Sequence, residues 1–152
     1  MSFYEFLNNH GIEYSQEQDA LGGIVLSIKK EDLLACCEIL KTDRLFNYDM
    51  LLAVTGMDCR THFELLYDLY STRSHNKLSI KIKTDRLNPC VESLVSLYSA
   101  ADWHERECFD LLGIEFINHP NLERILLPKD WVGHPLRKDY KQEDERLCWN
   151  KR

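Results

Sequence analysis

The segment from Trp103 to Tyr140 places the strongest limit on how this chain can fold. Beyond Gly113 it holds two His-Pro dipeptides, a further proline and a Trp-Val-Gly turn, and these interruptions leave no room for a long helix. Each proline also pushes the residue before it towards extended backbone. We therefore expect a core domain over residues 1–117 and an extended docking arm over residues 118–152, with part of the arm's backbone hydrogen bonds made to something outside the domain.

The residues before the arm show the periodicities of both strands and helices. Apolar, aromatic and β-branched runs predict strands over residues 22–28, 48–54, 63–70 and 78–83. Helical spacing predicts helices near the start and over residues 31–40, 91–98 and 102–112. Asp102 is the expected cap of the last helix and Gly113 its stop, while Gly56-Met57-Asp58 is the expected turn between two strands. The expected fold is α+β: a four-stranded, mostly antiparallel sheet with helices packed on one side and an extended C-terminal arm.

Length and charge narrow the class of protein. A chain of 152 residues fits one domain with a single core. Its 19 Lys and Arg against 25 Asp and Glu give a net charge of −6, which does not suggest binding to nucleic acid. No apolar run approaches the ~20 residues that span a bilayer, and the first residues lack the pattern of a signal peptide. We expect the protein in the cytoplasm or on the equivalent side of an organelle membrane.

Motifs that hold cofactors are missing from the sequence. The six cysteines form no C-x-x-C pair, so they fit neither a zinc ribbon nor an iron–sulfur run. There is no G-x-G-x-x-G, no phosphate-binding loop of the Walker type and no nucleophile elbow. We expect the chain to bind no cofactor, and any nucleotide, flavin or metal chemistry to reside in other chains of an assembly.

One short stretch superficially resembles a zinc motif. His104 and Cys108 lie four residues apart on the expected helix and flank Glu105, as in H-E-x-x-H. The second ligand is a cysteine, however, and no convincing third ligand follows. We favour a structural interpretation in which Cys108 packs in the core and His104 lies at the surface, and we keep a free-standing metalloenzyme as a rival hypothesis.

The charged groups of the segment form two sets that could pair with each other. Taken alone, the charged residues of the expected helix would form an ordinary solvated face. Beside the charged residues of the arm, they resemble halves of ion pairs that hold the arm against the domain or a partner. We expect Arg137 to pair with a buried carboxylate. His119 and His134 are interpreted as hydrogen-bonding struts, and Trp103 and Trp131 as anchors of either an interface or the core. The helix set is Glu105, Arg106, Glu107 and Asp110, and the arm set is Arg124, Arg137, Lys138 and Asp139.

The order of these residues is specific. E-R-E-x-x-D-L-x-G-I-x-F followed by H-P-x-L-x-R-I-L-x-P-x-D-W-x-G-H-P-L-R-K-D-Y resembles the signature of the 30-kilodalton-type subunit of NADH:quinone oxidoreductase, respiratory complex I. This subunit is called C in bacteria and J in cyanobacterial and plastid relatives. Glu123 departs from the pattern, because an arginine is usual at that position.

The resemblance implies a non-catalytic, cofactor-free scaffold subunit in the peripheral arm of a proton-translocating complex. Its neighbours would be the large quinone-module subunit and the iron–sulfur subunits, with NAD(H), quinone and iron–sulfur clusters held elsewhere in the assembly. It would lie peripherally on the cytoplasmic side of the inner membrane, or on the matrix or stromal side in an organelle, and touch the membrane only through the complex. The alternative is the equivalent subunit of a membrane-bound hydrogenase or of a ferredoxin- or F420-dependent relative.

The resemblance also marks the residues expected to form the interface. They are Trp103, Glu105, Arg106, Glu107, Asp110, Gly113, His119, Pro120, Arg124, Asp130, Trp131, Gly133, His134, Pro135, Arg137, Lys138, Asp139 and Tyr140.

Overall fold

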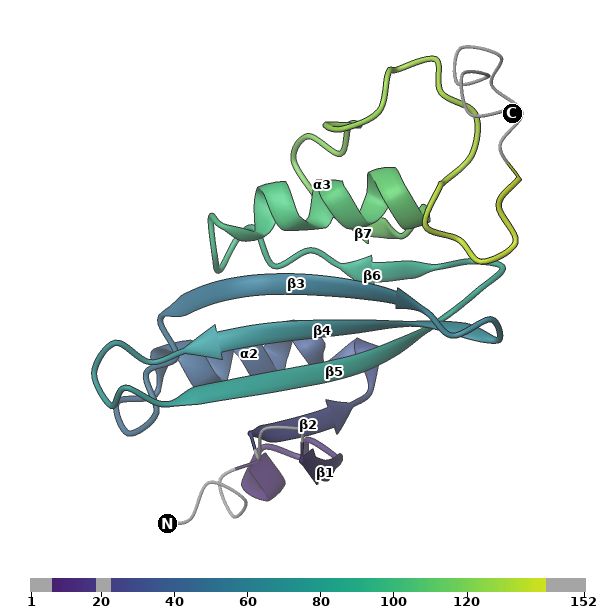
Figure 1. The fold of residues 1–152 in the computed structure, drawn as a ribbon. Coiled ribbons are helices and arrows are strands. Elements are labelled where there is room, and N and C mark those ends of the chain that lie inside the picture. The colour runs from purple at the N-terminus through teal and green to yellow at the C-terminus, as the bar shows by residue number, and fades with distance from the viewer. Residues whose placement is uncertain (1–6, 19–22, 142–152) are drawn as a thin grey trace.

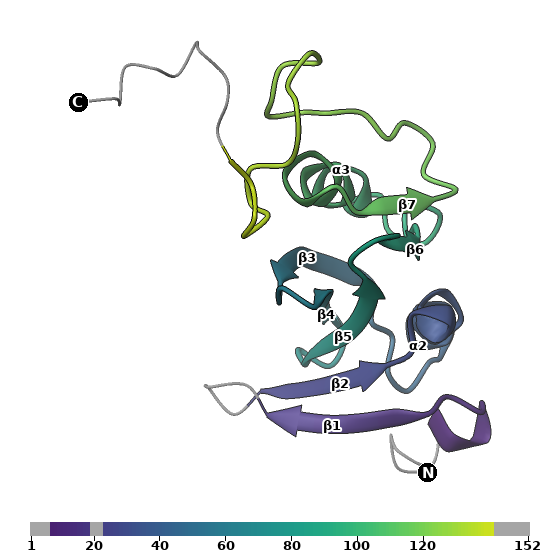
Figure 2. The same ribbon diagram turned by 90° about the vertical axis from the view of Figure 1, so that its right-hand side faces the viewer.

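A computed structural model describes residues 7–18 and 23–141 of the chain. The strands form a curved layer, with α3 and the arm stacked beyond the β3 edge (Figures 1 and 2). In chain order the elements are β1 (Tyr14–Gln18), β2 (Ile24–Ile28), a 3₁₀ turn η1 (Lys30–Asp32), α2 (Leu33–Thr42), β3 (Met50–Asp58), β4 (His62–Tyr70), β5 (Lys77–Asp85), β6 (Cys90–Glu92), α3 (Ala101–Leu112) and β7 (Glu115–Ile117).

The main sheet has five strands in the order β1-β2-β5-β4-β3, and β6 and β7 form a separate parallel pair. Within the main sheet only β2 and β5 run parallel. The predicted α+β class and mostly antiparallel sheet are therefore confirmed, with one strand more than expected. The additional strand, β1, has no buried residue, so its sequence lacks the apolar alternation that identifies a half-buried strand.

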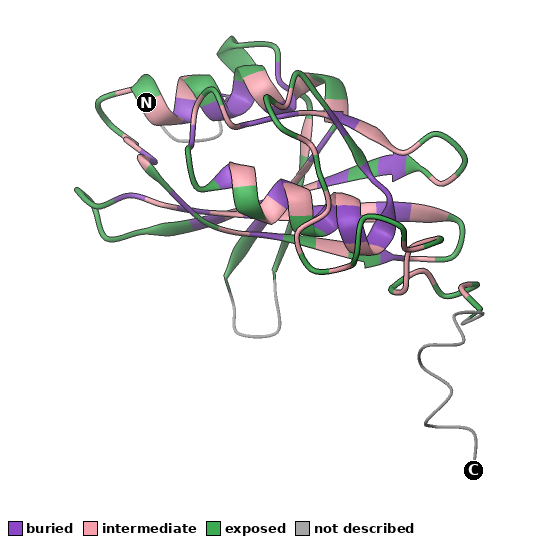
Figure 3. Cartoon of the chain, turned by 90° about the horizontal axis from the view of Figure 1, so that it is seen from above, coloured by how far each residue is buried: buried purple, intermediate pink, exposed green. Residues whose placement is uncertain are grey.

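Alternation along β4 and β5 builds the core. Phe63, Leu65, Tyr67 and Leu69 are fully buried, and their partners on β5 in the ladder are buried with them. Cysteines of both α2 and α3 belong to the same buried cluster, so the two helices cover one face of the sheet. Figure 3 shows buried residues along the strands and helices, whereas the arm is largely exposed or half-buried.

The turn predicted at the end of β3 is wrong. Gly56-Met57-Asp58 is not a turn but the last part of β3, and the chain reverses at Cys59–Thr61, where Arg60 takes φ +68°. Gly56 pairs with Leu65 of β4, and the strand needs a glycine here because α3 packs directly on it. A Cβ at this position would meet Leu112 Cδ1 at 2.5 Å and Cys108 Sγ at 3.3 Å.

The helix expected over residues 91–98 is also wrong. Cys90–Glu92 instead pairs in parallel with Glu115–Ile117, a long-range partner that local spacing does not reveal. The apolar residues that follow form a turn closed by hydrogen bonds from Leu97 and Tyr98 to the Leu94 carbonyl. The helix over residues 102–112 is confirmed as α3, with Ala100 rather than Asp102 at its N-cap and Gly113 in the left-handed conformation at its end.

The contact at Gly56 can be tested by adding one methyl group. Gly56→Ala should lower the free energy of unfolding by about 1–3 kcal/mol, because the added Cβ would lie 2.5 Å from Leu112 Cδ1 and the buried Leu112 side chain would have to shift. Denaturant unfolding of Gly56→Ala, Leu112→Ala and the double variant measures the effect. The double variant should lose less than the sum of the single losses, since Leu112→Ala removes the clashing carbon. Additive losses would contradict direct packing of α3 on Gly56.

Candidate functional site

A single carboxylate on α3 organises the start of the arm. Asp110 is fully buried, and its Oδ2 accepts hydrogen bonds from the backbone N–H groups of Ile125, Leu126 and Leu127 at 3.0, 2.7 and 3.0 Å. Its Oδ1 accepts one from Arg124 Nη1 at 2.7 Å. Burial raises the pKa of Asp110, but these N–H donors and the arginine outweigh it and leave the pKa below its ordinary value. The carboxylate is therefore charged and fully engaged.

Arg124 connects α3 to both halves of the arm. Besides the Asp110 carboxylate, its Nη1 donates to the Asp110 carbonyl at 2.9 Å. Its Nη2 donates to the carbonyls of Trp131 at 3.2 Å and Gly133 at 3.0 Å. The planar guanidinium suits this role, because it presents several donors in a fixed geometry. The arm consequently follows a defined path without regular secondary structure.

The end of α3 is closed by two side chains of the arm. Arg137 donates to the carbonyls of Leu112 at 2.6 Å and Gly113 at 3.3 Å, which have no partner within the helix. His134 Nδ1 lies 2.9 Å from the Asp110 carbonyl, which can only accept, so Nδ1 carries the proton. Burial, with the nearby Arg137 and Arg124 charges, lowers the pKa of His134 and keeps its ring neutral. Gly113 is required because a Cβ would lie 2.5 Å from the His134 ring.

The far end of the arm is fixed to the sheet by Asp58. This buried carboxylate at the end of β3 accepts hydrogen bonds from the backbone N–H of Lys138 at 2.8 Å and of Arg60 at 2.7 Å. It also pairs with Arg86, which reaches Asp139 on the arm at 2.7 Å. The hydrogen bond from Arg86 holds the pKa of Asp58 well below its ordinary range. Sequence reasoning missed this pair because it placed Asp58 in a turn.

Of the ion pairs expected between the charged residues of α3 and those of the arm, one is present. Arg124 pairs with Asp110, as charge complementarity suggested. Arg137 does not meet a buried carboxylate; it bonds the terminal carbonyls of α3. Lys138 takes part through its backbone, and Asp139 pairs with Arg86 from the end of β5.

Glu105 lies on the other side of α3 and is also fully buried. Its carboxylate accepts from the Ser93 hydroxyl at 2.6 Å and from the Leu94 N–H at 2.7 Å, joining α3 to the chain after β6. Burial raises the pKa of Glu105 to about 7, with a further contribution from Asp102. The His119 side chain is fully enclosed, with Nε2 3.3 Å from the Asp102 carbonyl, which agrees with the role of a strut.

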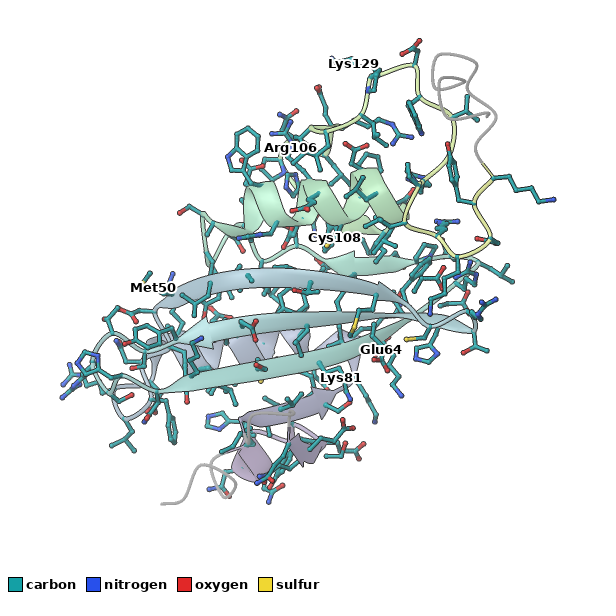
Figure 4. The ribbon with its side chains drawn as sticks, viewed as in Figure 1. Met50, Glu64, Lys81, Arg106, Cys108 and Lys129 are labelled. Atoms are coloured by element: carbon teal, nitrogen blue, oxygen red, sulfur yellow. The ribbon has the colours of Figure 1, made fainter. Side chains whose placement is uncertain are left out.

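The residues of the zinc-like stretch on α3 lie in different surroundings. Cys108 is buried and its thiol donates to the Val54 carbonyl at 3.8 Å, while His104 is half-buried. Burial raises the pKa of the Cys108 thiol to about 12. Figure 4 shows Cys108 on the side of α3 that faces the sheet and Arg106 on the side that faces the arm. Within the described residues 7–18 and 23–141, the side chains of His104, Glu105 and Cys108 do not come together as ligands of one metal ion.

The expected interface residues thus divide by depth. Glu105, Asp110 and Gly113 are buried; Asp110 and Gly113 lie beneath the arm, whereas Glu105 joins α3 to the chain after β6. Half-buried members are Arg106, His119, Arg124, Trp131, Gly133, His134, Pro135, Arg137 and Tyr140. Those at the surface are Trp103, Glu107, Pro120, Asp130, Lys138 and Asp139.

Three apolar side chains on the described part of the arm are exposed, and sequence reasoning singled out none of them. Leu126, Val132 and Leu136 are 60%, 85% and 57% exposed, and Trp103 on α3 is 61% exposed. A hollow of about 610 Å³ lies along the arm beside Val132, Gly133, Arg137 and Tyr140. A surface of this kind, apolar with charged groups at its margin, is typical of protein–protein contacts.

Comparison with protein families gives a match over most of the chain. A model of the family described as the 30 Kd subunit of respiratory-chain NADH dehydrogenase matches residues 26–146. The C subunit of the NADH-quinone oxidoreductase of Geobacter metallireducens is 38% identical over 123 residues, 78% of this chain and 75% of that one. The protein of the same name from Trichlorobacter lovleyi is 42% identical over 123 residues, with the same coverage of both chains.

Two solved structures share the fold. One is described as a trypsin-resistant fragment of Nqo5, with a TM-score of 0.68 and 23% identity over 78% of this chain and 96% of that one. The other is a chain of the membrane-bound sulfane sulfur reductase, described as an archaeal respiratory membrane complex. It has a TM-score of 0.74 and 19% identity over 92% of this chain and 84% of that one. Across the described part of the chain, none of the helices has the length and apolar character needed to cross a membrane.

The Asp110–Arg124 pair yields a stability prediction with an internal control. Arg124→Ala should cost about 3–5 kcal/mol, because it leaves a buried carboxylate without its cation. Lys129→Ala should cost about 0–1 kcal/mol, since Lys129 is 86% exposed where it pairs with Glu123. Denaturant unfolding gives the totals. Amide hydrogen exchange at residues 125–127 shows whether the arm opens first. Equal losses in the two variants would contradict the central role of Arg124.

The raised pKa of Glu105 gives stability a specific pH dependence. Between its ordinary pKa of 4.5 and the folded value of about 7, the folded chain retains a proton that the unfolded chain releases. The free energy of unfolding should therefore fall as pH rises through this range, by on the order of 3 kcal/mol. Glu105→Gln should remove this fall, which denaturant titrations at a series of pH values would detect. An unchanged slope in the variant would assign the effect to another group.

Proposed function

This chain belongs to the family of the 30-kDa subunit of respiratory-chain NADH dehydrogenase, and on that premise we propose that it is a scaffold in the peripheral arm of such a complex. In this proposal it holds none of the electron carriers. Its neighbours are the large quinone-module subunit and the iron–sulfur subunits, while NAD(H), quinone and the clusters belong to the rest of the assembly. It lies on the cytoplasmic side of the inner membrane, or on the matrix or stromal side in an organelle, and reaches the membrane only through its partners.

One observation carries this proposal: the arm is fastened from beneath and leaves apolar side chains outside. Asp110, Arg124 and Arg137 satisfy backbone groups of the arm and the end of α3 from the inner side. Leu126, Val132 and Leu136 remain exposed. Fixing an irregular segment before a partner arrives lowers the entropic cost of binding, which is what a docking element needs. We propose the interface over residues 103–140, with the domain core ending near residue 117.

The chemistry of the buried groups supports a structural role. Asp110 and Asp58 have their carboxylate oxygens engaged by N–H donors and arginines, and Arg137 is engaged with helix carbonyls. Among the described cysteines, the two on α2 and Cys108 on α3 are buried and have raised thiol pKa values, which makes them poor nucleophiles. These residues hold the fold together and offer no acid, base or nucleophile to a substrate.

A second candidate is the equivalent subunit of a membrane-bound hydrogenase or of a ferredoxin- or F420-dependent complex. It is favoured by the likeness of the fold to a chain of a sulfane sulfur reductase, an archaeal respiratory complex. Purification of the native complex through a tag on this chain separates the two hypotheses. A nucleotide-binding subunit among its partners supports the NADH enzyme, and a nickel-containing one supports the hydrogenase. Recovery of the chain alone from native membranes would contradict both.

The docking surface can be removed without disturbing the fold. Val132→Asp with Leu136→Asp should change the free energy of unfolding by less than about 0.5 kcal/mol, because both side chains are exposed. The same pair should abolish recovery of the assembled complex, because charges would enter an apolar contact. Leu45→Asp is the matched control, since Leu45 is 66% exposed between α2 and β3, outside the arm. If the double variant assembles as well as the control, the docking surface lies elsewhere.

A further inference from the structure

The turn between β3 and β4 brings together three side chains that do not belong to the docking arm. Cys59 precedes β4, while His62 and Glu64 stand on the strand itself, two residues apart and so on the same face. One ligand atom from each, a sulfur, a nitrogen and an oxygen, lies within 4.8 Å of the others. We propose that these three residues form a binding site for a divalent cation of the zinc class, separate from the docking arm and independent of the proposed scaffold role.

The distances suit a tetrahedral ion. His62 Nε2 and Glu64 Oε1 are 3.2 Å apart. Two ligand atoms at ordinary Zn–N and Zn–O bond lengths, on neighbouring corners of a tetrahedron, are separated by roughly 3.3 Å. The two side chains therefore stand at the spacing that a shared ion requires. The Cys59 sulfur lies within 4.8 Å of the other two ligand atoms and would move closer to them to complete three protein ligands, with a water molecule as the fourth.

The histidine is oriented as metal-bound histidines are. His62 Nδ1 lies 2.9 Å from the Thr61 hydroxyl oxygen, which can accept its proton. In the metal-free chain Nε2 faces the Glu64 carboxylate, which can only accept, so an ion would have to displace the Nε2 proton. Nδ1 would then keep a proton that the Thr61 hydroxyl accepts. Metal-ligating histidines usually make such a second hydrogen bond, because it fixes the ring and the tautomer. Thr61 would be the positioning residue of the site.

The turn itself is held rigidly. The Cys59 N–H donates to the His62 carbonyl at 2.9 Å, and the Arg60 N–H donates to the Asp58 carboxylate at 2.7 Å. Asp58 is in turn fixed by Arg86 and by the backbone of Lys138. Preorganised ligands lose little freedom when an ion binds, which favours affinity.

The choice of ion follows from the donors. A thiolate with an imidazole and one carboxylate is a borderline-soft set, which suits Zn²⁺ and disfavours Mg²⁺ or Ca²⁺ with their all-oxygen shells. One group opposes binding: Lys83 Nζ lies 3.5 Å from Glu64 Oε1 on the neighbouring strand. The Lys83 side chain is 58% exposed and can move away. Lys81 also lies near Glu64 on this face of the sheet, but Glu17 engages it (Figure 4).

The test is a titration of the full, reduced chain with Co²⁺ and then Zn²⁺, after removal of any histidine tag. One equivalent of Co²⁺ should produce the visible bands of a tetrahedral ion and a thiolate-to-cobalt charge-transfer band, and Zn²⁺ should abolish both. Cys59→Ser should remove the charge-transfer band. His62→Gln and Glu64→Gln should weaken zinc binding by more than about tenfold, and Thr61→Ala by about tenfold. Lys83→Ala should strengthen binding, because it removes the competing ammonium.

Cys90→Ser is the matched control, since Cys90 is the other half-buried free cysteine of the described residues and lies on β6. It should bind cobalt and zinc as the unaltered chain does. Saturating zinc should raise the thermal transition of the unaltered chain and of Cys90→Ser, but not of Cys59→Ser. The proposal is overturned if no charge-transfer band appears at one equivalent, or if Cys59→Ser and His62→Gln retain zinc as tightly as Cys90→Ser, which would show adventitious binding only.

Discussion

The buried Asp110 carboxylate is the constraint on which the rest of the arm depends. A negative charge near the C-terminal end of a helix is opposed by the helix dipole, and its burial adds a desolvation cost. Three consecutive backbone N–H groups and one guanidinium offset both effects. Because the donors come from the arm and the acceptor from α3, each element satisfies the polar groups of the other. Neither can be altered at this point without exposing an unpaired group of its neighbour.

Much of the fold was readable from local patterns. The alternation of β4 and β5 and the apolar stripe of α3 each follow from residues adjacent in sequence, and Gly113 ended α3 where a left-handed residue was expected. The failures lie where a distant partner decides the outcome. The sequence of β1 carries no buried face, β6 exists because β7 pairs with it, and Gly56 lies within a strand because it pairs with β4. None of these partners is visible within a short window of sequence.

The residues of the site could be predicted from the sequence, but most of the contacts between them could not. Opposite charges on the helix and the arm indicated pairing, and Arg124 with Asp110 is such a pair. Arg137 could not be assigned from charge alone, because a guanidinium bonds the carbonyls of a helix end as readily as it bonds a carboxylate. Asp58 and Arg86 lie far from the arm in sequence, and only the return of the chain to the β3 end brings Lys138 and Asp139 to them. The exposed apolar side chains of the arm carry no signal until the backbone shows which way they face.

The contact between Asp58 and the backbone of Lys138 joins residues 80 positions apart. Closing so long a loop is slow and is rewarded only after both ends are in place, so the far end of the arm gains this anchor only once the end of β3 is in place. The start of the arm, in contrast, is held by Asp110, which is 14 residues from Arg124. The arm also follows β3, β4 and α3 along the chain and therefore leaves the ribosome after them. We therefore expect folding to follow the order of synthesis, with the core forming first and the docking surface after it. A chain with a misfolded sheet would not present that surface, and assembly would itself select for correctly folded subunits.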